Sequence, residues 1–267
     1  MTIRDQRRIR LPASIAVLAG AVALGVLAAP APRTNQHEIS PSFLIGPRNY
    51  SAAARSSANP ANAPSVFTAD KGKFRITING QQIGSEEFSL SPSGDDWVER
   101  STMSAHAAAG AEIKATGQLR LAADGSPLHY EWSAEAQKKA TGSVEFSGMT
   151  AKCTGDFEGA NPLRKDFTFN TGHIAVLDNN LYYQYAVLAR QYDWKTGGKQ
   201  NFSVVIPQDM VPGSVAVESA PPAPGGKDAS EALRVSTPDL EILLYLDSTQ
   251  RLIRLEVPSS NAVIERE

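Results

Sequence analysis

Residues 178–192, DNNLYYQYAVLARQY, carry the only long helical pattern in a chain whose other patterns are those of strands. At about 100° per residue, the apolar side chains fall in one arc of about 160°. They are Leu181, Tyr182, Tyr185, Ala186, Leu188, Ala189 and Tyr192. An apolar face this wide has to be covered, and only sheet is available to cover it. We therefore expect a mainly β fold, in which a strongly curved antiparallel meander sheet (a half-open barrel) wraps one amphipathic helix.

The ends of this helix are also marked. Asp178 is expected to cap its start by accepting hydrogen bonds from the amides of Asn180 or Leu181. Arg190 suits the negative end of the helix dipole, and the glycine pair at 197–198 is expected to end the segment. The other side of the helix carries Gln184, Arg190 and Gln191, together with the apolar Tyr183 and Val187.

The first 28 residues have the pattern of a signal peptide. Four arginines precede an apolar, Ala-rich run at 11–27, and Val26-Leu27-Ala28 supplies the small residues of a cleavage site. We expect cleavage after Ala28 and a periplasmic or secreted protein. The alternative is an uncleaved anchor, because the run of about 17 residues is at the lower limit for spanning a membrane. Contact with the membrane is expected only through this segment.

Residues 29–65 are rich in Ala, Pro and Ser, and are expected to form a disordered tether. Residues 66–267 are expected to form a single β-rich domain, which is long enough to bury a core without disulfides. The chain is mildly acidic, with a formal net charge of −2, and becomes more acidic once the signal arginines are removed. This charge argues against nucleic acid as a partner.

Ten or more short strand patterns fill this region. They cover residues 73–78, 82–90, 97–103, 111–121, 128–133, 141–153 and 165–170 before the helix, and 201–206, 214–218, 232–236, 240–246 and 252–257 after it. Asn79-Gly80 is the preferred pair for a tight type I′ hairpin turn. Most of the strands are joined by short turns, so we expect each strand to pair with the next.

The sequence has no G-x-S-x-G, H-E-x-x-H or C-x-x-C motif and no glycine-rich phosphate loop. We therefore expect no catalytic residues, no cofactor and no metal, and a protein that is not an enzyme. Cys153 is the only cysteine, so an intramolecular disulfide is excluded and a small buried side chain is expected.

Several polar groups have two interpretations. His129 and Glu131 share one strand face, where they are either metal ligands or solvated side chains. His173 is either a polar group at the mouth of a cavity or an ordinary loop residue. The acidic pairs Glu86-Glu87 and Asp95-Asp96, and Asp239 with Glu241, are interpreted as surface charge rather than as a glycosidase pair, because adjacent side chains on a strand point to opposite faces.

The aromatic residues of the helix also have two interpretations. They either pack as core or line an apolar cavity between helix and sheet. On the second interpretation the candidate ligand-lining residues are Leu181, Tyr182, Tyr185, Leu188 and Tyr192.

Three short sequence motifs carry a family resemblance. They are Ile78-Asn79-Gly80 followed by Ile83-Gly84, then Leu177-Asp178-Asn179-Asn180 before the helix, and a terminal hairpin with Tyr245, Asp247, Arg251 and Leu252. Together they resemble exported bacterial domains of unknown function whose shape is similar to the lipoprotein carriers LolA and LolB. The resemblance implies a half-open barrel around a helix in an envelope protein that binds an apolar ligand, and it transfers no catalytic residue.

The expected function is therefore that of a non-enzymatic envelope protein that binds an apolar small molecule or lipid between helix and sheet. The alternative is a structural module whose sheet edge or tether recruits another envelope protein. A weaker alternative is a hydrolase that uses His129 or His173 with a nearby acid.

Overall fold

The structure is a computed structural model that describes residues 65–106, 110–222 and 229–267. The predicted signal peptide and the tether up to residue 64 lie outside the described residues, so both stay predictions. The strands are β1 (Asp70–Ile78), β2 (Gln81–Ser93), β3 (Asp96–His106), β4 (Glu112–Leu121), β5 (Pro127–Glu135), β6 (Lys139–Ser147), β7 (Thr150–Phe157), β8 (Leu163–Thr168), β9 (Ile174–Val176), β10 (Gln200–Ile206), β11 (Val211–Ala220), β12 (Glu231–Ser236), β13 (Glu241–Leu246), β14 (Leu252–Val257) and β15 (Ala262–Arg266). The helical elements are α2 (Tyr183–Gln191) and the short 3-10 turn η2 (Pro258–Ser260).

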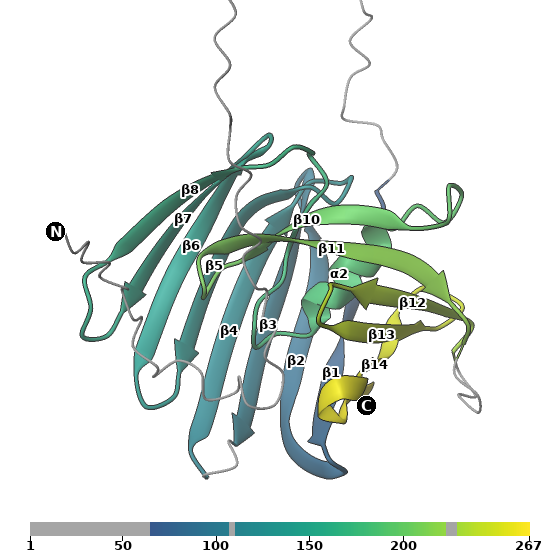
Figure 1. The fold of residues 1–267 in the computed structure, drawn as a ribbon, viewed down its shortest axis with the longest axis horizontal. Coiled ribbons are helices and arrows are strands. Elements are labelled where there is room, and N and C mark those ends of the chain that lie inside the picture. Colours follow the sequence, from purple (N-terminus) through teal and green to yellow (C-terminus); the bar gives the residue numbers. More distant parts are fainter. Residues whose placement is uncertain (1–64, 107–109, 223–228) are drawn as a thin grey trace, which may run out of the picture.

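All of these strands belong to one sheet, in the order β8-β7-β6-β5-β4-β3-β2-β1-β15-β14-β13-β12-β11-β10-β9. Two antiparallel meanders, β1–β8 and β10–β15, are joined where the first and last strands pair, with Ile76 opposite Ile264. Figure 1 shows the sheet from its broad side, with α2 lying behind the strands of the second meander. The predicted mainly β fold, with a curved sheet around one helix, is confirmed.

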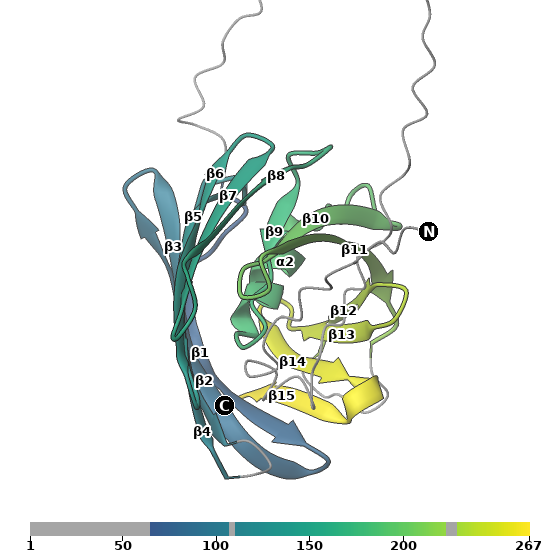
Figure 2. The same ribbon diagram turned by 60° about the vertical axis from the view of Figure 1, so that its left-hand side comes forward.

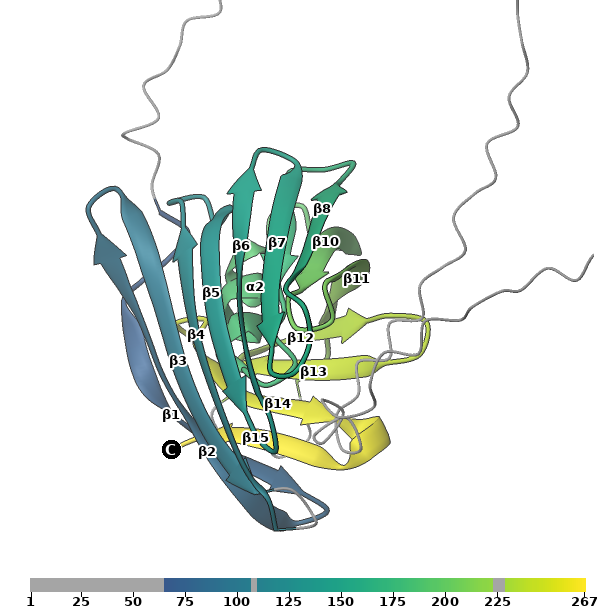
Figure 3. The ribbon, with the colours of Figure 1, turned by 90° about the vertical axis from the view of Figure 1, so that its left-hand side faces the viewer.

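The sheet folds back on itself, so that the two meanders form facing walls. In Figure 2, β1–β8 make one wall, β10–β15 make the other, and α2 lies between them. The view in Figure 3 looks onto the outside of the first wall and shows α2 behind it. The hydrophobic core fills this hollow with inward side chains from both walls and from the helix.

Strand alternation and turn chemistry explain most of the first wall. In β1, Phe74 and Ile76 are buried, as their predicted face requires. Asn79 and Gly80 both have positive φ, at 50° and 78°, and form the predicted tight turn into β2.

Three features differ from the sequence prediction. Residues 141–153 form parts of two strands, because Gly148, with φ 56°, reverses the chain between β6 and β7. β9 and β15 were not predicted, since each is short and shows too few residues to establish a period. β9 pairs with β10 in parallel, whereas the predicted meander was antiparallel throughout.

The described part of the chain holds no helix with both the length and the apolarity needed to cross a bilayer.

Candidate functional site

The helix α2 is surrounded on almost all sides. Its residues from Tyr183 to Ala189 are all buried, and only Arg190 and Gln191 are partly exposed. Burial therefore extends beyond the predicted apolar arc, because Tyr183, Gln184 and Val187 are covered as well. The helix lies between the two walls (Figure 2), and its buried residues leave no solvent-facing side over its first two turns.

The five candidate ligand-lining residues all lie in the core. The exposed fractions are 1% for Leu181, 5% for Tyr182, 3% for Tyr185, 0% for Leu188 and 3% for Tyr192. At the end of the segment, the Tyr192 hydroxyl donates to the Gly198 carbonyl at 2.7 Å and its ring meets Trp194 edge-on. The structure therefore packs these side chains together in one apolar core between helix and sheet, and their role as ligand-lining residues stays a prediction.

The start of α2 is held by Glu86 of β2 rather than by the predicted cap. One Glu86 carboxylate oxygen accepts the amide of Tyr182 at 2.7 Å, and the other accepts the amide of Tyr183 at 3.1 Å. Amides at a helix start have no partners within the helix and carry partial positive charge. A carboxylate on the neighbouring sheet therefore docks the helix to the first wall.

Asp178 has a different role from the predicted one. It accepts the Asn180 amide at 2.8 Å, as expected, but the helix begins only at Tyr183. Its other oxygen accepts the Tyr130 hydroxyl at 2.6 Å and the side-chain amide of Gln208. Asp178 therefore fixes the approach to the helix against β5 and the β10–β11 turn.

A third acid, Glu99 of β3, completes a buried cluster with Glu86 and Asp178. Their exposed fractions are 0% for Glu86, 0% for Glu99 and 3% for Asp178. The Ser101 hydroxyl donates to Glu99 Oε1 at 2.5 Å, and Gln184 Oε1 accepts the Asp178 amide at 2.6 Å. Among the described residues, Glu99 Oε2 and Gln184 Nε2 are buried without a hydrogen-bond partner.

Burial is the main cause of the raised pKa values of these three acids. It raises the pKa of Glu86 to about 7, although the amides of Tyr182 and Tyr183 favour the charged form. Burial also raises the pKa of Glu99 to about 8, and the negative charge of Glu86 adds to that effect. The pKa of Asp178 is raised as well, again chiefly by burial. Burial therefore favours the protonated form of all three acids.

The interpretation of Glu86 as surface charge was wrong. Adjacent acids on the strand do point to opposite faces, since Glu87 is exposed, but the inward face of β2 carries Glu86 together with Phe88 and Leu90. Strand alternation contained the signal, because a carboxylate at every-second-residue spacing from two large apolar side chains is expected inside.

His129 and Glu131 lie on the outer face of β5. His129 Nε2 is 3.2 Å from Glu131, and its Nδ1 is 2.9 Å from Glu145 on β6. Within the described ranges, no group of three His, Cys, Asp or Glu side chains has an arrangement that could hold a metal ion. The three side chains form a polar group on the sheet surface.

His173 lies in the loop before β9. Its side chain is exposed, and its ring meets Phe202 edge-on at 6.2 Å between centroids. Neither histidine belongs to the buried cluster, so the structure does not combine them into one site.

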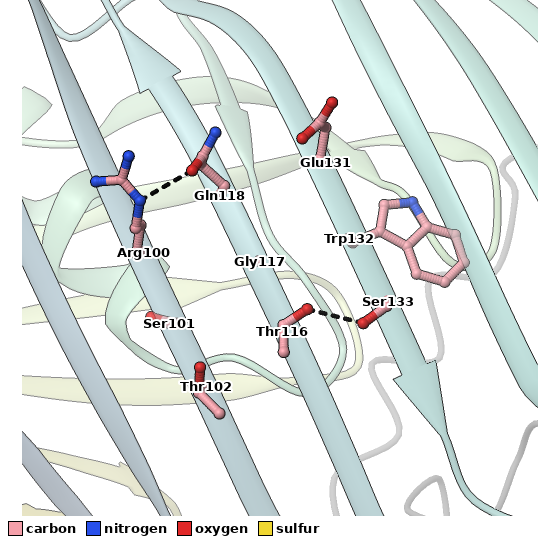
Figure 4. A pocket seen from close by; sticks show the side chains of 9 residues that line it. All are labelled: Arg100, Ser101, Thr102, Thr116, Gly117, Gln118, Glu131, Trp132 and Ser133. Carbon is pink, nitrogen blue, oxygen red and sulfur yellow. Dashed lines mark hydrogen bonds between the residues drawn. The ribbon is translucent and has the colours of Figure 1, made fainter.

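A shallow depression of about 350 Å³ lies on the outer face of β3, β4 and β5, which Figure 4 shows from nearby. Two pairs of its polar side chains are hydrogen-bonded: Arg100 donates to Gln118 at 2.9 Å, and the Thr116 and Ser133 hydroxyls are 2.7 Å apart. This face is open, polar sheet surface, whereas the unusual chemistry of the described residues lies on the inner face, at the start of α2.

No protein-family model matches the sequence, and no curated protein matches it. Among solved structures, the chain is similar to a beta-barrel-like protein of the domain of unknown function DUF1849 from Brucella abortus, with a TM-score of 0.48 and 10% identity over 74% of this chain and 94% of that one. It is also similar to a DUF1089 family protein from Pseudomonas aeruginosa, with a TM-score of 0.41 and 13% identity over 63% of this chain and 87% of that one. The resemblance to LolA and LolB stays a prediction.

Proposed function

We propose that the protein is a non-enzymatic binding protein of the bacterial envelope, which holds an apolar or lipid-like molecule between α2 and the concave face of the sheet. The supporting observation is that the sheet does not close. Its two edges are β8 and β9, and among the described residues no ladder joins them. The apolar interior can therefore be reached without breaking hydrogen bonds between strands.

Side chains hold the two walls together along this open edge. Lys165 of β8 donates to the Met210 carbonyl in the β10–β11 turn at 3.1 Å. The Met210 side chain packs on Gly155 of β7, where an added Cβ would lie 3.3 Å from the sulfur. Met210 is only 1% exposed, so its side chain fills the space between the two walls at this junction. Such contacts separate more easily than a strand ladder does.

The interior beyond this junction suits an apolar molecule. The five candidate residues, on α2 and at its two ends, pack in one core with aliphatic and aromatic side chains of both walls, and Phe88 stacks on Tyr183 at 4.1 Å between ring centroids. Apolar surface of this kind binds by burial, at about 25 cal/mol per Å². A bound molecule would take the place of side-chain contacts between α2 and a wall.

The first experiment is native mass spectrometry of protein purified from a bacterial envelope, followed by solvent extraction of the bound material. We expect a co-purified lipid-like species in the extract. In parallel, a fluorescent fatty acid is titrated into protein freed of that material, and saturable binding is expected. The proposal fails if the extract is empty and the titration shows no saturation.

A variant pair tests the route of entry. Met210→Gly removes the side chain that fills this junction, at a position whose φ of 50° suits glycine. The variant should take up the fluorescent fatty acid faster than the wild type. The control is Met149→Gly in the exposed β6–β7 turn, where the side chain is 50% exposed and uptake should be unchanged. Equal uptake rates for both variants and the wild type would place the entry route elsewhere.

A second function, recruitment of another envelope protein, is favoured by the edge strand β8. Its residues 163–166 are exposed, and an uncovered edge can pair with a strand of a partner. Lys165, which points inward, counts against this, because inward charge on an edge strand discourages pairing. A pull-down should then yield one stoichiometric partner, and deletion of residues 29–64 would show whether the tether or the edge recruits it.

A further inference from the structure

We propose that the buried carboxyl groups of Glu86, Glu99 and Asp178 make the docking of α2 pH-dependent, so that the helix start is held most firmly against the sheet in acidic solution and less firmly as pH rises. The device is separate from ligand binding and operates in the ligand-free protein. It rests on where these three acids lie and on what surrounds them.

The three acids come from three elements that meet at the helix start. Glu86 accepts the Tyr182 and Tyr183 amides, so one negative charge there is stabilised by the helix. Asp178 accepts the Tyr130 hydroxyl and the Asn180 amide, which ties the approach to the helix to β5. These contacts satisfy Glu86 and Asp178.

Glu99 is not satisfied in the same way. Ser101 donates to its Oε1, whereas its Oε2 is buried with no partner among the described residues. Gln184, on the first turn of the helix, also has a buried side-chain nitrogen without a partner. A charge on Glu99 would be compensated only by the Ser101 hydroxyl, which makes the charged form costly in this position.

No cation offsets the cluster. None of the three acids forms an ion pair with a Lys, Arg or His in the described part of the chain. The charged and titratable groups that face the cluster are Tyr130 from β5, Tyr182 and Tyr183 from the helix, Asp209 from the β10–β11 turn, and Arg100, which neighbours Glu99 on β3 but lies on the outer face. Apart from Arg100, every one of them is neutral or negative at neutral pH.

These surroundings determine whether docking strengthens or weakens as pH rises. With the helix docked, burial holds the pKa of Glu99 at about 8, whereas in a released, solvated state it would return toward 4.5. The docked form therefore binds the proton more tightly, and docking weakens as pH rises between these values. Each unit of this difference changes the docking equilibrium about tenfold. Above about pH 8 the effect levels off, because Glu99 is then ionised in both states.

Hydrogen–deuterium exchange of the ligand-free protein measures the docking directly. Between pH 6 and pH 9, after correction for intrinsic exchange rates, protection of amides 182–188 should fall about tenfold or more in the wild type. Glu99→Gln keeps the shape of the side chain without its charge, so this variant should lose clearly less protection between pH 6 and pH 9 than the wild type does. The matched control is Glu87→Gln on the outer face of β2, which should behave as the wild type does.

Either of two results overturns the proposal: protection in the wild type that is equal at pH 6 and pH 9, or a Glu99→Gln variant that follows the wild-type profile. If that variant does not fold, infrared spectroscopy of the wild type supplies the test. The carbonyl band of protonated carboxyl groups should persist at pH 7 and disappear by pH 9. Absence of the band at pH 7 would also overturn the proposal.

Discussion

Leu181 lies directly over Gly117 of β4, so closely that a Cβ atom added at Gly117 would be 2.5 Å from Leu181 Cδ1 and 2.7 Å from the Tyr130 hydroxyl. Real Cβ atoms do not approach other atoms this closely, so the segment before α2 sits as near to the sheet as a glycine permits. The contact fixes the depth of the helix in the hollow. It also joins one candidate ligand-lining residue to the tyrosine that holds Asp178.

Gly117→Ala should therefore push Leu181 and the helix start away from the sheet. We expect a loss of about 1–3 kcal/mol in the free energy of unfolding, as for other overpacked core positions. Urea denaturation measures it. The control is Gln118→Ala, the next residue, whose side chain lies on the outer face and should cost less than about 0.5 kcal/mol. A Gly117→Ala variant as stable as this control would show that the helix is not packed at this depth.

Tyr130→Phe removes the hydroxyl that donates to Asp178 Oδ2 at 2.6 Å. Asp178 is buried, so the lost donor is not replaced by bulk water, and we expect a cost of about 1–3 kcal/mol in unfolding free energy. Tyr245→Phe is the matched control, because its hydroxyl donates to Glu256 at 3.2 Å, where water can replace it. Equal effects of the two substitutions would contradict a special role for the Asp178 contact.

Sequence reasoning reached the architecture because strand alternation and turn residues are local signals. The buried face of β1 and the Asn79-Gly80 turn follow from neighbouring residues alone, and so does the need for a sheet to cover the helix. The pairing of β1 with β15 could not be predicted in that way, since it joins residues about as far apart as the domain allows. The local signal in β15 is only five residues long.

The candidate site shows the same division. The apolar residues of α2 were identified from their helical spacing, whereas Glu86 and Glu99 were not recognised as buried. Their positions depend on which face of β2 and β3 turns inward and on where the helix start lies relative to that face. Only the folded chain brings Glu86 to the amides of Tyr182 and Tyr183, which lie 96 and 97 residues away along the sequence.

Cys153 should be unreactive in the native protein. Its side chain is 2% exposed on the inner face of β7, and burial raises the pKa of the thiol to about 11. Since the thiolate is the reactive form, a thiol reagent at pH 8 should label the folded protein far more slowly than protein in denaturant. Fast labelling of folded protein would show that β7 opens readily near the edge of the sheet.

Asp247 organises the turn between β13 and β14, in the terminal hairpin that carries the family resemblance. It accepts the Thr249 and Arg251 amides at 2.8 and 3.0 Å and pairs with the Arg251 guanidinium. Partial burial acts to raise its pKa, but the hydrogen bonds outweigh this and lower the pKa to about 2.

The pKa of Asp247 is lower in the folded than in the unfolded chain, so its contribution to stability is present above about pH 4 and is lost as pH falls toward 2. Asp247→Asn should cost about 1 kcal/mol at pH 7, because solvent screens this surface turn, and should cost less at pH 2. Denaturation at the two pH values measures the difference. A cost that does not change with pH would assign the effect to the shape of the turn rather than to its charge.

Arg266, on β15, links this strand to β1 and to α2 through its side chain. Its guanidinium donates to both oxygens of Asp70 on β1, at 2.5 and 3.0 Å, and to the Lys71 carbonyl at 2.8 Å, and it lies 5.0 Å from the centre of the Phe88 ring. Asp70 in turn accepts the Tyr183 hydroxyl at 3.1 Å, so the pair reaches α2.

Arg266→Lys keeps the charge but loses the bidentate hydrogen bonding to Asp70 and the stacking on Phe88. We therefore expect this substitution to lower the free energy of unfolding by about 1–3 kcal/mol. The side chains of Arg266 and Asp70 are only 14% and 7% exposed, and little water can fill the gap. The matched control is Arg75→Lys, because Arg75 pairs with Glu265 across the same two strands but in solvent, at 43% and 32% exposure. This control should cost less than about 1 kcal/mol. Equal costs would mean that β1 and β15 are held together by their backbone hydrogen bonds alone. A larger cost for Arg266→Lys, together with faster hydrogen exchange in α2, would show that the Arg266 guanidinium couples the pairing of these two strands to the docking of the helix.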